Sequence, residues 1–200
     1  MRYLNSYLTF RHLSLLSLCL LLAACASSVT PPARYMLPSA PSVSAPSQPQ
    51  GTLQLRPPRL AHYLDVDGII MQLDDITLNE ARQHQWAESL GRQLERSLRT
   101  QLAAEVPTLQ VVREDGSAQQ ALTLMIEIDQ FQGRYDGQAV TSGQWQLRSA
   151  NNQLLALKSF SAETVLDQDG YPALVRALGE SWSSVATQIA NDIRTHRYFD

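Results

Sequence analysis

The chain has 200 residues, with 16 lysines and arginines against 19 aspartates and glutamates, for a formal net charge of −3. No block of basic residues interrupts this mildly acidic composition, which excludes a nucleic-acid-binding protein. The only cysteines are Cys19 and Cys25. Because both lie near the amino terminus, the sequence also excludes a fold that depends on disulfides or on thiolate-bound metal.

The first 25 residues have the pattern of a bacterial lipoprotein signal. Arg2 and Arg11 precede an apolar run over 13–24, which is too short to span a bilayer, since a helix needs about 20 apolar residues. Leu22-Ala23-Ala24-Cys25 then resembles a lipobox. We predict a signal peptide over 1–24 and a mature chain that begins at Cys25, acylated with diacylglycerol and palmitate. The alternative is an ordinary secretory signal with an incidental cysteine.

Several acyl chains on Cys25 would hold the protein to a bilayer almost permanently. Ala26 follows, where an aspartate would favour the inner membrane in enterobacterial sorting, so we expect the periplasmic face of the outer membrane. Residues 25–52 are rich in proline and serine and predict an extended tether, with a possible short strand over 34–37. Fully extended from Cys25 to Leu53, this tether would span about 90 Å at about 3.3 Å per residue. A single folded domain is predicted over 53–200.

The sequence pattern gives only weak signals for the first strands of the domain. Residues 53–60 alternate but contain Pro57-Pro58, which predicts an edge strand or a strand end. Residues 69–73 and 76–78 flank Asp74-Asp75 and predict a hairpin with a tight acidic turn. Two signals then conflict, because Thr77 with Glu80 matches a helix capping box while the alternation of a strand continues. We favour a strand to about His84.

An amphipathic helix follows and ends before Pro107. Its apolar residues recur every four positions: Trp86, Leu90, Leu94, Leu98 and Leu102. Its polar side carries charges of both signs, which favours packing on a sheet over the alternative of a partner-binding or membrane-surface helix.

The second half of the chain predicts three long strands after a short one over 109–112. Residues 122–128 alternate strictly, and the phase slips near Gln130, which predicts a bulge. Asp136-Gly137 and Asn151-Asn152 mark hairpin turns. The further strands are expected over 140–147 and 154–165.

Asp169-Gly170-Tyr171-Pro172 opens a last helix, whose apolar stripe runs from Leu174 through Trp182 to Ile193. We therefore predict an α+β fold in one domain, with an antiparallel meander sheet packed against two long amphipathic helices. Thr123, Glu127 and Asp129 indicate that the opposite face of the sheet is partly wet.

Motifs of enzymes and metal sites are absent from the sequence. It contains no Gly-x-Ser-x-Gly, no His-Glu-x-x-His and no glycine-rich phosphate loop. His62, His84 and His196 have no partner at ligand spacing. Asp65–Gly68 and Asp167–Gly170 resemble the end of a calcium loop but lack its first acidic ligand, and we interpret them as turns. We expect no catalytic residue, no metal and no cofactor apart from the lipid on Cys25.

Several short motifs together resemble one known family. They are the lipobox, Tyr35-Met36-Leu37, Tyr63-Leu64 ahead of Gly68-Ile69-Ile70, Trp86-Ala87, Phe131-Gln132-Gly133-Arg134-Tyr135-Asp136-Gly137, Ser142-Gly143-Gln144-Trp145, and Asp169-Gly170-Tyr171 before the helix of Trp182. Over nearly all of its mature length the chain is similar to the PqiC-like lipoproteins of the ABC-type transport auxiliary family. The run over 131–137 is the most specific part of the match.

The resemblance implies a non-enzymatic lipoprotein of the outer membrane, in a transenvelope lipid transport system that is built around MCE-domain proteins and maintains outer-membrane integrity. It implies that a ring of identical subunits docks on the outer-membrane end of an MCE-domain periplasmic tunnel. A multispanning inner-membrane protein would be an indirect partner. Two other functions stay open: a stand-alone scaffold lipoprotein, and a periplasmic hydrolase with a site assembled from distant residues.

Arg134, Tyr135 and Asp136 are the candidate contact residues. They lie where a bulged strand meets a tight turn, which directs side chains outward. We therefore expect them to contribute to subunit or partner contacts. The alternative is that Gly133 and Tyr135 only shape the bulge and the core.

Overall fold

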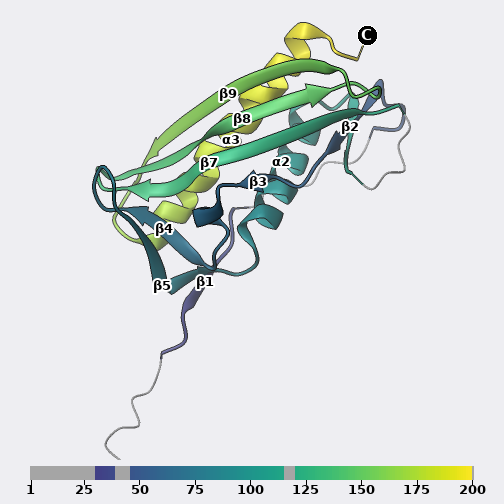
Figure 1. Ribbon diagram of the computed structural model, residues 1–200. Coiled ribbons are helices and arrows are strands. Elements are labelled where there is room, and N and C mark those ends of the chain that lie inside the picture. Colours follow the sequence, from purple (N-terminus) through teal and green to yellow (C-terminus); the bar gives the residue numbers. More distant parts are fainter. Residues whose placement is uncertain (1–29, 39–45, 115–119, 200) are drawn as a thin grey trace, which may run out of the picture. The chain divides into compact units, whose positions relative to one another are not determined.

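The computed structural model describes residues 30–38, 46–114 and 120–199. The chain divides into two compact units, Met1–Pro31 and Pro32–Asp200. The predicted signal peptide and Cys25 lie outside the described residues. The second unit is the α+β domain, and it begins well before residue 53, where the sequence placed its start (Figure 1). Within the described ranges, no helix is long and apolar enough to cross a membrane.

The domain consists of nine strands in one sheet, two long helices and a short 3-10 helix, η1, over the described ranges. The strands are β1 (Ala33–Tyr35), β2 (Gly51–Leu55), β3 (Arg59–Leu60), β4 (Gly68–Gln72), β5 (Leu78–Trp86), β6 (Leu109–Arg113), β7 (Leu122–Arg134), β8 (Gln138–Arg148) and β9 (Leu154–Val165). The helices are η1 (His62–Leu64), α2 (Leu90–Glu105) and α3 (Tyr171–His196).

The long strand β7 organises the sheet. On one side it pairs antiparallel with β8 over its whole length, and β8 pairs antiparallel with β9. On its other side the short strands β2, β3 and β4 follow one another along its length, all parallel to it. The sheet is therefore mixed, and the prediction of an antiparallel meander sheet was wrong for the sheet as a whole. Parallel pairs join segments far apart in the chain, so no local turn signals them.

The segment over 53–60, predicted as an edge strand or a strand end, forms two strands. β2 ends at Leu55, just before the prolines, but lies inside the sheet, whereas β3, among the described strands, pairs with β7 alone. β2 lies between β6 and β7, and its residues Leu53 and Leu55 are fully buried. Pro57-Pro58 separates β2 from β3, which pairs with β7 further along. The prolines therefore mark the gap between two strands, where no ladder hydrogen bond is needed from them.

The other predicted elements are largely confirmed. β4 and β5 form the expected hairpin, and Asp74 Oδ1 accepts hydrogen bonds from the backbone N–H groups of Ile76 (2.9 Å) and Thr77 (2.7 Å). The strand continues to Trp86, so this residue ends β5 and does not open the helix. The register of β7 shifts between Ile128 and Gln130, where the bulge was predicted. Three residues connect β7 to β8, with Gly137 at φ 80°.

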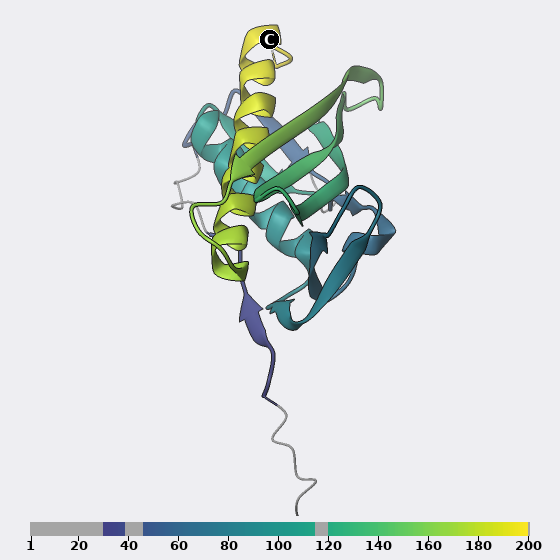
Figure 2. The ribbon, with the colours of Figure 1, turned by 90° about the vertical axis from the view of Figure 1, so that its left-hand side faces the viewer.

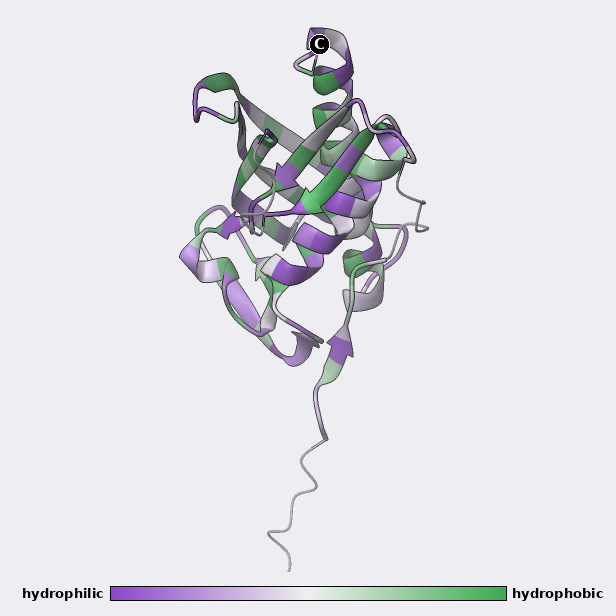
Figure 3. Ribbon diagram, turned by 90° about the vertical axis from the view of Figure 1, so that its right-hand side faces the viewer, coloured by the Kyte–Doolittle hydropathy of each residue, from purple (hydrophilic) through white to green (hydrophobic). Residues whose placement is uncertain are grey.

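Both helices cover one face of the sheet and form the core with it (Figure 1). Each alternates between hydrophobic and hydrophilic residues along its length, as an amphipathic helix does (Figure 3). Trp182 of α3 is fully buried, and its indole N–H donates to the backbone oxygen of Leu94 in α2 at 3.2 Å. Its ring packs edge-on against Phe131 and Phe160 of the sheet. This residue thus joins the two helices to β7 and β9.

Candidate functional site

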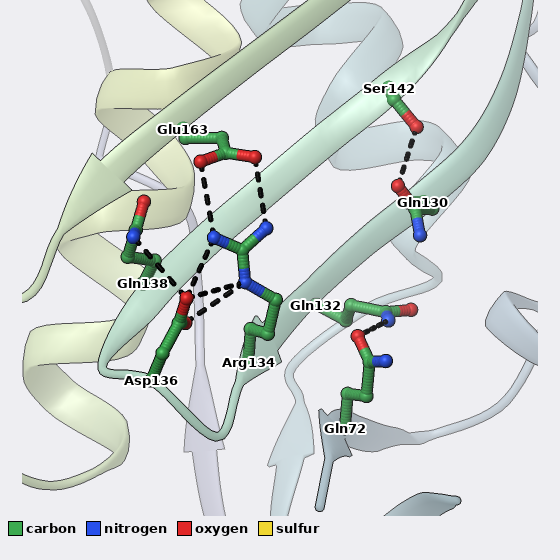
Figure 4. Close-up of polar contacts among 8 residues, drawn as sticks. All are labelled: Gln72, Gln130, Gln132, Arg134, Asp136, Gln138, Ser142 and Glu163. Carbon is green, nitrogen blue, oxygen red and sulfur yellow. Dashed lines mark hydrogen bonds and ion pairs between the residues drawn. The ribbon is translucent and has the colours of Figure 1, made fainter. Parts of the chain in front are cut away.

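The predicted contact residues lie at the turn between β7 and β8, around the side chain of Arg134. Its Nε donates to both carboxylate oxygens of Asp136 at 2.9 Å, and its two terminal nitrogens donate to Glu163 of β9 at 2.9 and 3.1 Å (Figure 4). One guanidinium therefore holds the turn to the neighbouring strand. Its hydrogen-bond donors are largely used within the chain, which leaves Arg134 better suited to positioning the turn than to contacting a partner.

Arg134, Asp136 and Glu163 stabilise one another in their charged forms. The bonds from Arg134 lower the pKa of the Asp136 carboxyl and that of the Glu163 carboxyl, and the same bonds raise the pKa of the guanidinium. All three groups lie at the surface, so the gain in stability is screened by solvent. The cluster carries two negative charges and one positive charge, and it is not poised for proton transfer.

The neighbouring residues Gly133 and Tyr135 differ in role. A Cβ atom on Gly133 would lie 2.4 Å from Sδ of Met71 and 2.9 Å from Cδ2 of Leu174, so both core side chains would have to shift to admit a larger residue at this point of β7. The side chain of Tyr135 is 58% exposed at the tip of the turn. Gly133 thus shapes the core, as the alternative interpretation stated, whereas Tyr135 is available for contact.

A line of amide side chains continues from this cluster across the face of the sheet that the helices leave open (Figure 4). Gln132 of β7 is buried and donates to Oε1 of Gln72 in β4 at 3.2 Å. The hydroxyl of Tyr63 in η1 lies 2.8 Å from Oε1 of Gln132 and 2.7 Å from the backbone oxygen of Asp129. Burial, and next the negative charge of Asp129, raise the pKa of Tyr63 to about 12. The network connects three elements through neutral groups.

A second functional feature is the joint between the N-terminal segment and the domain. β1 pairs parallel with the end of β5, and the backbone N–H of Leu37 donates to Oε1 of Gln93 in α2 at 2.8 Å. Leu37 and the Gln93 side chain are both buried. The sequence predicted only a possible strand here. Gln93 was missed because its partner is a backbone group 56 residues away.

The structure brings together no group of three or more His, Cys, Asp or Glu residues that would hold a metal, over the residues it describes. The three histidines among the described residues lie apart. His84 stacks on Tyr171 with 4.0 Å between ring centroids and bonds the hydroxyl of Tyr35 at 2.9 Å, while His196 lies beside Asp192 and His62 is exposed in η1. The described residues show no assembled catalytic centre.

Comparisons with known proteins agree with this picture. The family model of the ABC-type transport auxiliary lipoprotein component matches residues 35–190. The chain is 34% identical over 176 residues to the intermembrane transport lipoprotein PqiC of Escherichia coli (strain K12), an alignment that covers 86% of this chain and 92% of that protein. The same figures hold for PqiC of Shigella flexneri.

Solved structures show the same fold. A crystal structure of an uncharacterized protein, 27% identical, superposes with a TM-score of 0.72 and covers 82% of this chain and 99% of its own. A protein of Xanthomonas campestris, 18% identical, superposes with a TM-score of 0.64 over the same shares of the two chains. The second likeness concerns the fold alone.

Proposed function

Because this chain belongs to the ABC-type transport auxiliary lipoprotein family, we propose that it is a lipid-anchored subunit of an intermembrane lipid transport system. The family role is that of an auxiliary lipoprotein and not of an enzyme. The observation that carries the proposal is the match to PqiC, which covers 86% of the chain and most of the relative. The matched family region, 35–190, contains strands β2 to β9 and helix α2 in full, and helix α3 up to residue 190.

In this proposal, Cys25 carries the acyl chains and the protein lies at the periplasmic face of the outer membrane. The joint at Leu37 supports a short spacer rather than a long tether. Because β1 begins at Ala33, only residues 25–32 separate the anchor from the sheet, and they reach about 25 Å at most at about 3.3 Å per residue. The domain would thus act close to the lipid headgroups, and not about 90 Å away from them.

The further parts of the proposal concern partners. The domain would dock, as a ring of identical subunits, on the outer-membrane end of a periplasmic tunnel of MCE-domain protein, with an inner-membrane multispanning protein as indirect partner. The system would maintain outer-membrane integrity. The family membership supports these assignments.

The test is complementation of a deletion strain. Wild-type protein should restore resistance to detergent and exclusion of a hydrophobic dye, whereas Cys25→Ala should fail to do so and should lose incorporation of labelled palmitate. Cys19→Ala, in the predicted signal peptide, is the matched control and should behave as wild type. Full complementation by an unacylated Cys25→Ala protein would contradict the anchored role, and an unchanged outer membrane in the deletion strain would contradict the proposed function.

A further inference from the structure

Exposed apolar side chains gather at one end of the sheet. Among the described residues, eight large hydrophobic side chains are exposed, and five of them lie in or beside three neighbouring connections: Leu73, Ile76, Leu78, Tyr135 and Val165. Ile76 is the most exposed of all, at 87%, and Val165 follows at 73%. Single exposed hydrophobics are ordinary, but a gathering of this kind marks a contact surface.

Strand pairing brings these residues together. Met71 of β4 is paired in parallel with Gly133 of β7, so the β4–β5 turn (73–77) and the β7–β8 turn (135–137) leave the sheet side by side. Gln138 is paired with Val165, and the backbone N–H of Leu166 donates to the oxygen of Gly137, which adds the β9–α3 connection (166–170). Figure 1 shows the two turns at the left-hand end of the sheet, and Figure 2 views that end directly. We call these three connections the turn end.

A small apolar pocket opens beside the turn end. Its volume is about 130 Å³, and it is lined by Met71, Leu166, Gly170, Tyr171 and Leu174. The lining residues come from β4, the β9–α3 connection and the first turn of α3. A pocket on the scale of the roughly 150 Å³ cavity that holds a benzene-sized molecule accepts one apolar side chain. The turn end therefore offers both projecting hydrophobics and a recess, as protein contact sites do.

The charges of the turn end are of one sign. Its three connections contain Asp74, Asp75, Asp136, Asp167 and Asp169, all exposed, and no lysine or arginine. The nearest guanidinium of β7, Arg134, is engaged by Asp136 and Glu163. Backbone hydrogen bonds from Ile76 and Thr77 lower the pKa of Asp74, and the bonds from Arg134 lower that of Asp136, so both carboxyls stay charged near neutral pH.

We propose that the turn end is the docking surface for a protein segment that presents apolar side chains flanked by lysine or arginine. The apolar side chains would cover Ile76 and its neighbours and fill the pocket, and the basic residues would pair with the aspartates around them. Complementary charge at the rim of an apolar contact speeds association and rejects other partners. The inference rests on the proposed function in expecting a protein partner, and it adds the location and chemistry of the contact.

Two other occupants fit the turn end less well. A bilayer surface attracts elements with lysine and arginine beside their apolar residues, and here aspartates stand in those positions. A second copy that used the same end would bring two sets of aspartates together, and like charges repel across such a contact. Charge complementarity therefore favours a basic protein segment.

Crosslinking in cells tests this directly. A photoreactive benzoylphenylalanine is placed at Ile76 of the full-length protein, and in a second strain at Asn151, which is exposed in the β8–β9 turn. We expect an adduct at Ile76, absent at Asn151, whose crosslinked peptide contains apolar residues with lysine or arginine beside them. A phospholipid adduct, a peptide of this chain, a peptide without basic residues, or no adduct would each overturn the proposal.

Variants then separate apolar from charged contributions. With the photoreactive residue at Tyr135, Ile76→Ser should lower the yield of the same adduct by about tenfold, the effect of about 1.4 kcal/mol of binding, whereas Leu154→Ser, an exposed apolar residue outside the turn end, should not. The double variant Asp74→Asn, Asp75→Asn should lower the adduct yield as well. Asp65→Asn, which removes an exposed carboxylate outside the turn end, is the control and should not. Equal effects of Ile76→Ser and Leu154→Ser would contradict the docking surface. A lipid adduct would remove this inference and leave the transport role intact. An unchanged outer membrane in the deletion strain would contradict the transport role, whereas a basic peptide crosslinked at Ile76 would still locate a protein contact at the turn end.

Discussion

Pro38 occupies the space that a side chain at Gly179 would fill. A Cβ atom on Gly179 of α3 would lie 2.8 Å from Cδ of Pro38, and the stiff proline ring cannot give way without moving its backbone. Together with the hydrogen bond from Leu37 to Gln93 of α2, this contact seats the N-terminal segment on both helices. The segment around Leu37 and Pro38 is thereby joined to the helix layer, and not only to the edge of the sheet.

Gly179→Leu should therefore release the joint while the domain stays folded. We expect faster hydrogen exchange at the Leu37 amide and faster proteolysis after Arg34, with the exchange of α3 little changed. The matched control is Gly91→Ala in α2, whose new Cβ would lie 3.8 Å from the nearest atom, Cδ1 of Leu60. This control should be stabilised by about 0.5–1 kcal/mol, because alanine favours a helix over glycine. Unchanged exchange at Leu37 in Gly179→Leu would show that the joint does not depend on this contact.

Arg134→Ala should lower stability in a pH-dependent way. The pKa values of Asp136 and Glu163 are depressed in the folded state, so the stabilisation is present above their unfolded values, near 4, and is lost as pH falls through the folded values. The difference in unfolding free energy between wild type and variant should thus be largest at neutral pH and shrink below about pH 4.

Urea unfolding at a series of pH values measures this difference. Arg148→Ala is the control, because Arg148 bonds the side chain of Gln146 and the backbone oxygen of Asn152, neither of which titrates. Its effect should be nearly independent of pH. A pH-independent difference for Arg134→Ala would contradict the ion-pair interpretation.

Gly143→Ala should destabilise the fold severely, although it adds only one methyl group, because Gly143 is buried within β8. A Cβ atom at this position of β8 would lie 2.0 Å from the backbone oxygen of Glu127 and 2.9 Å from the ring of Phe160. The site lies opposite the bulge at Ile128, where β7 and β8 approach closely. We expect a loss of roughly 2–3 kcal/mol in thermal or urea unfolding, at the upper end of overpacking costs. A loss below about 0.5 kcal/mol would mean that the bulge relaxes freely.

Tyr63→Phe should change the alkaline limb of the stability curve. In the wild type the phenol ionises near pH 10 when unfolded and at about 12 when folded, so stability is fully present below pH 10 and is lost as pH rises toward 12. The variant lacks this loss, so its stability relative to wild type should improve above pH 10. A constant difference between the two proteins from pH 8 to 11.5 would contradict the assignment.

The elements with local signals were predictable from the sequence, and the parallel pairings were not. The strict alternation over 122–128 and the turns at Gly137 and Asn152 located β7, β8 and β9. The neighbours of β7 on its other side are parallel strands that come from residues 51–72, and nothing in the sequence near Leu53 indicates that its partner is Leu122. Pro57 and Pro58 suggested an edge strand or a strand end. A gap between two strands inside a sheet can contain the same prolines, so the sequence could not separate these cases.

The candidate site was predicted only in part, for a similar reason. The turn signal at Asp136-Gly137 drew attention to Arg134, but Glu163 belongs to a strand one hairpin further on. Val140 of β8 pairs with Gln132 of β7 on one side and with Glu163 of β9 on the other. This register can be derived by pairing residues outward from the two predicted turns, and it would have placed Glu163 near Arg134. The exposed hydrophobics of the turn end had no such signal, since Ile76 in a sequence looks like any strand residue.

Co-purification from the native envelope tests the central claim most directly. Full-length protein with a carboxyl-terminal tag is isolated from detergent-solubilised membranes of its own organism, and the proteins that accompany it are quantified by mass spectrometry against an untagged strain. The account predicts strong enrichment of an MCE-domain protein together with an acylated Cys25 peptide. An intact, acylated protein recovered without any MCE-domain partner would contradict it and would favour a stand-alone scaffold lipoprotein.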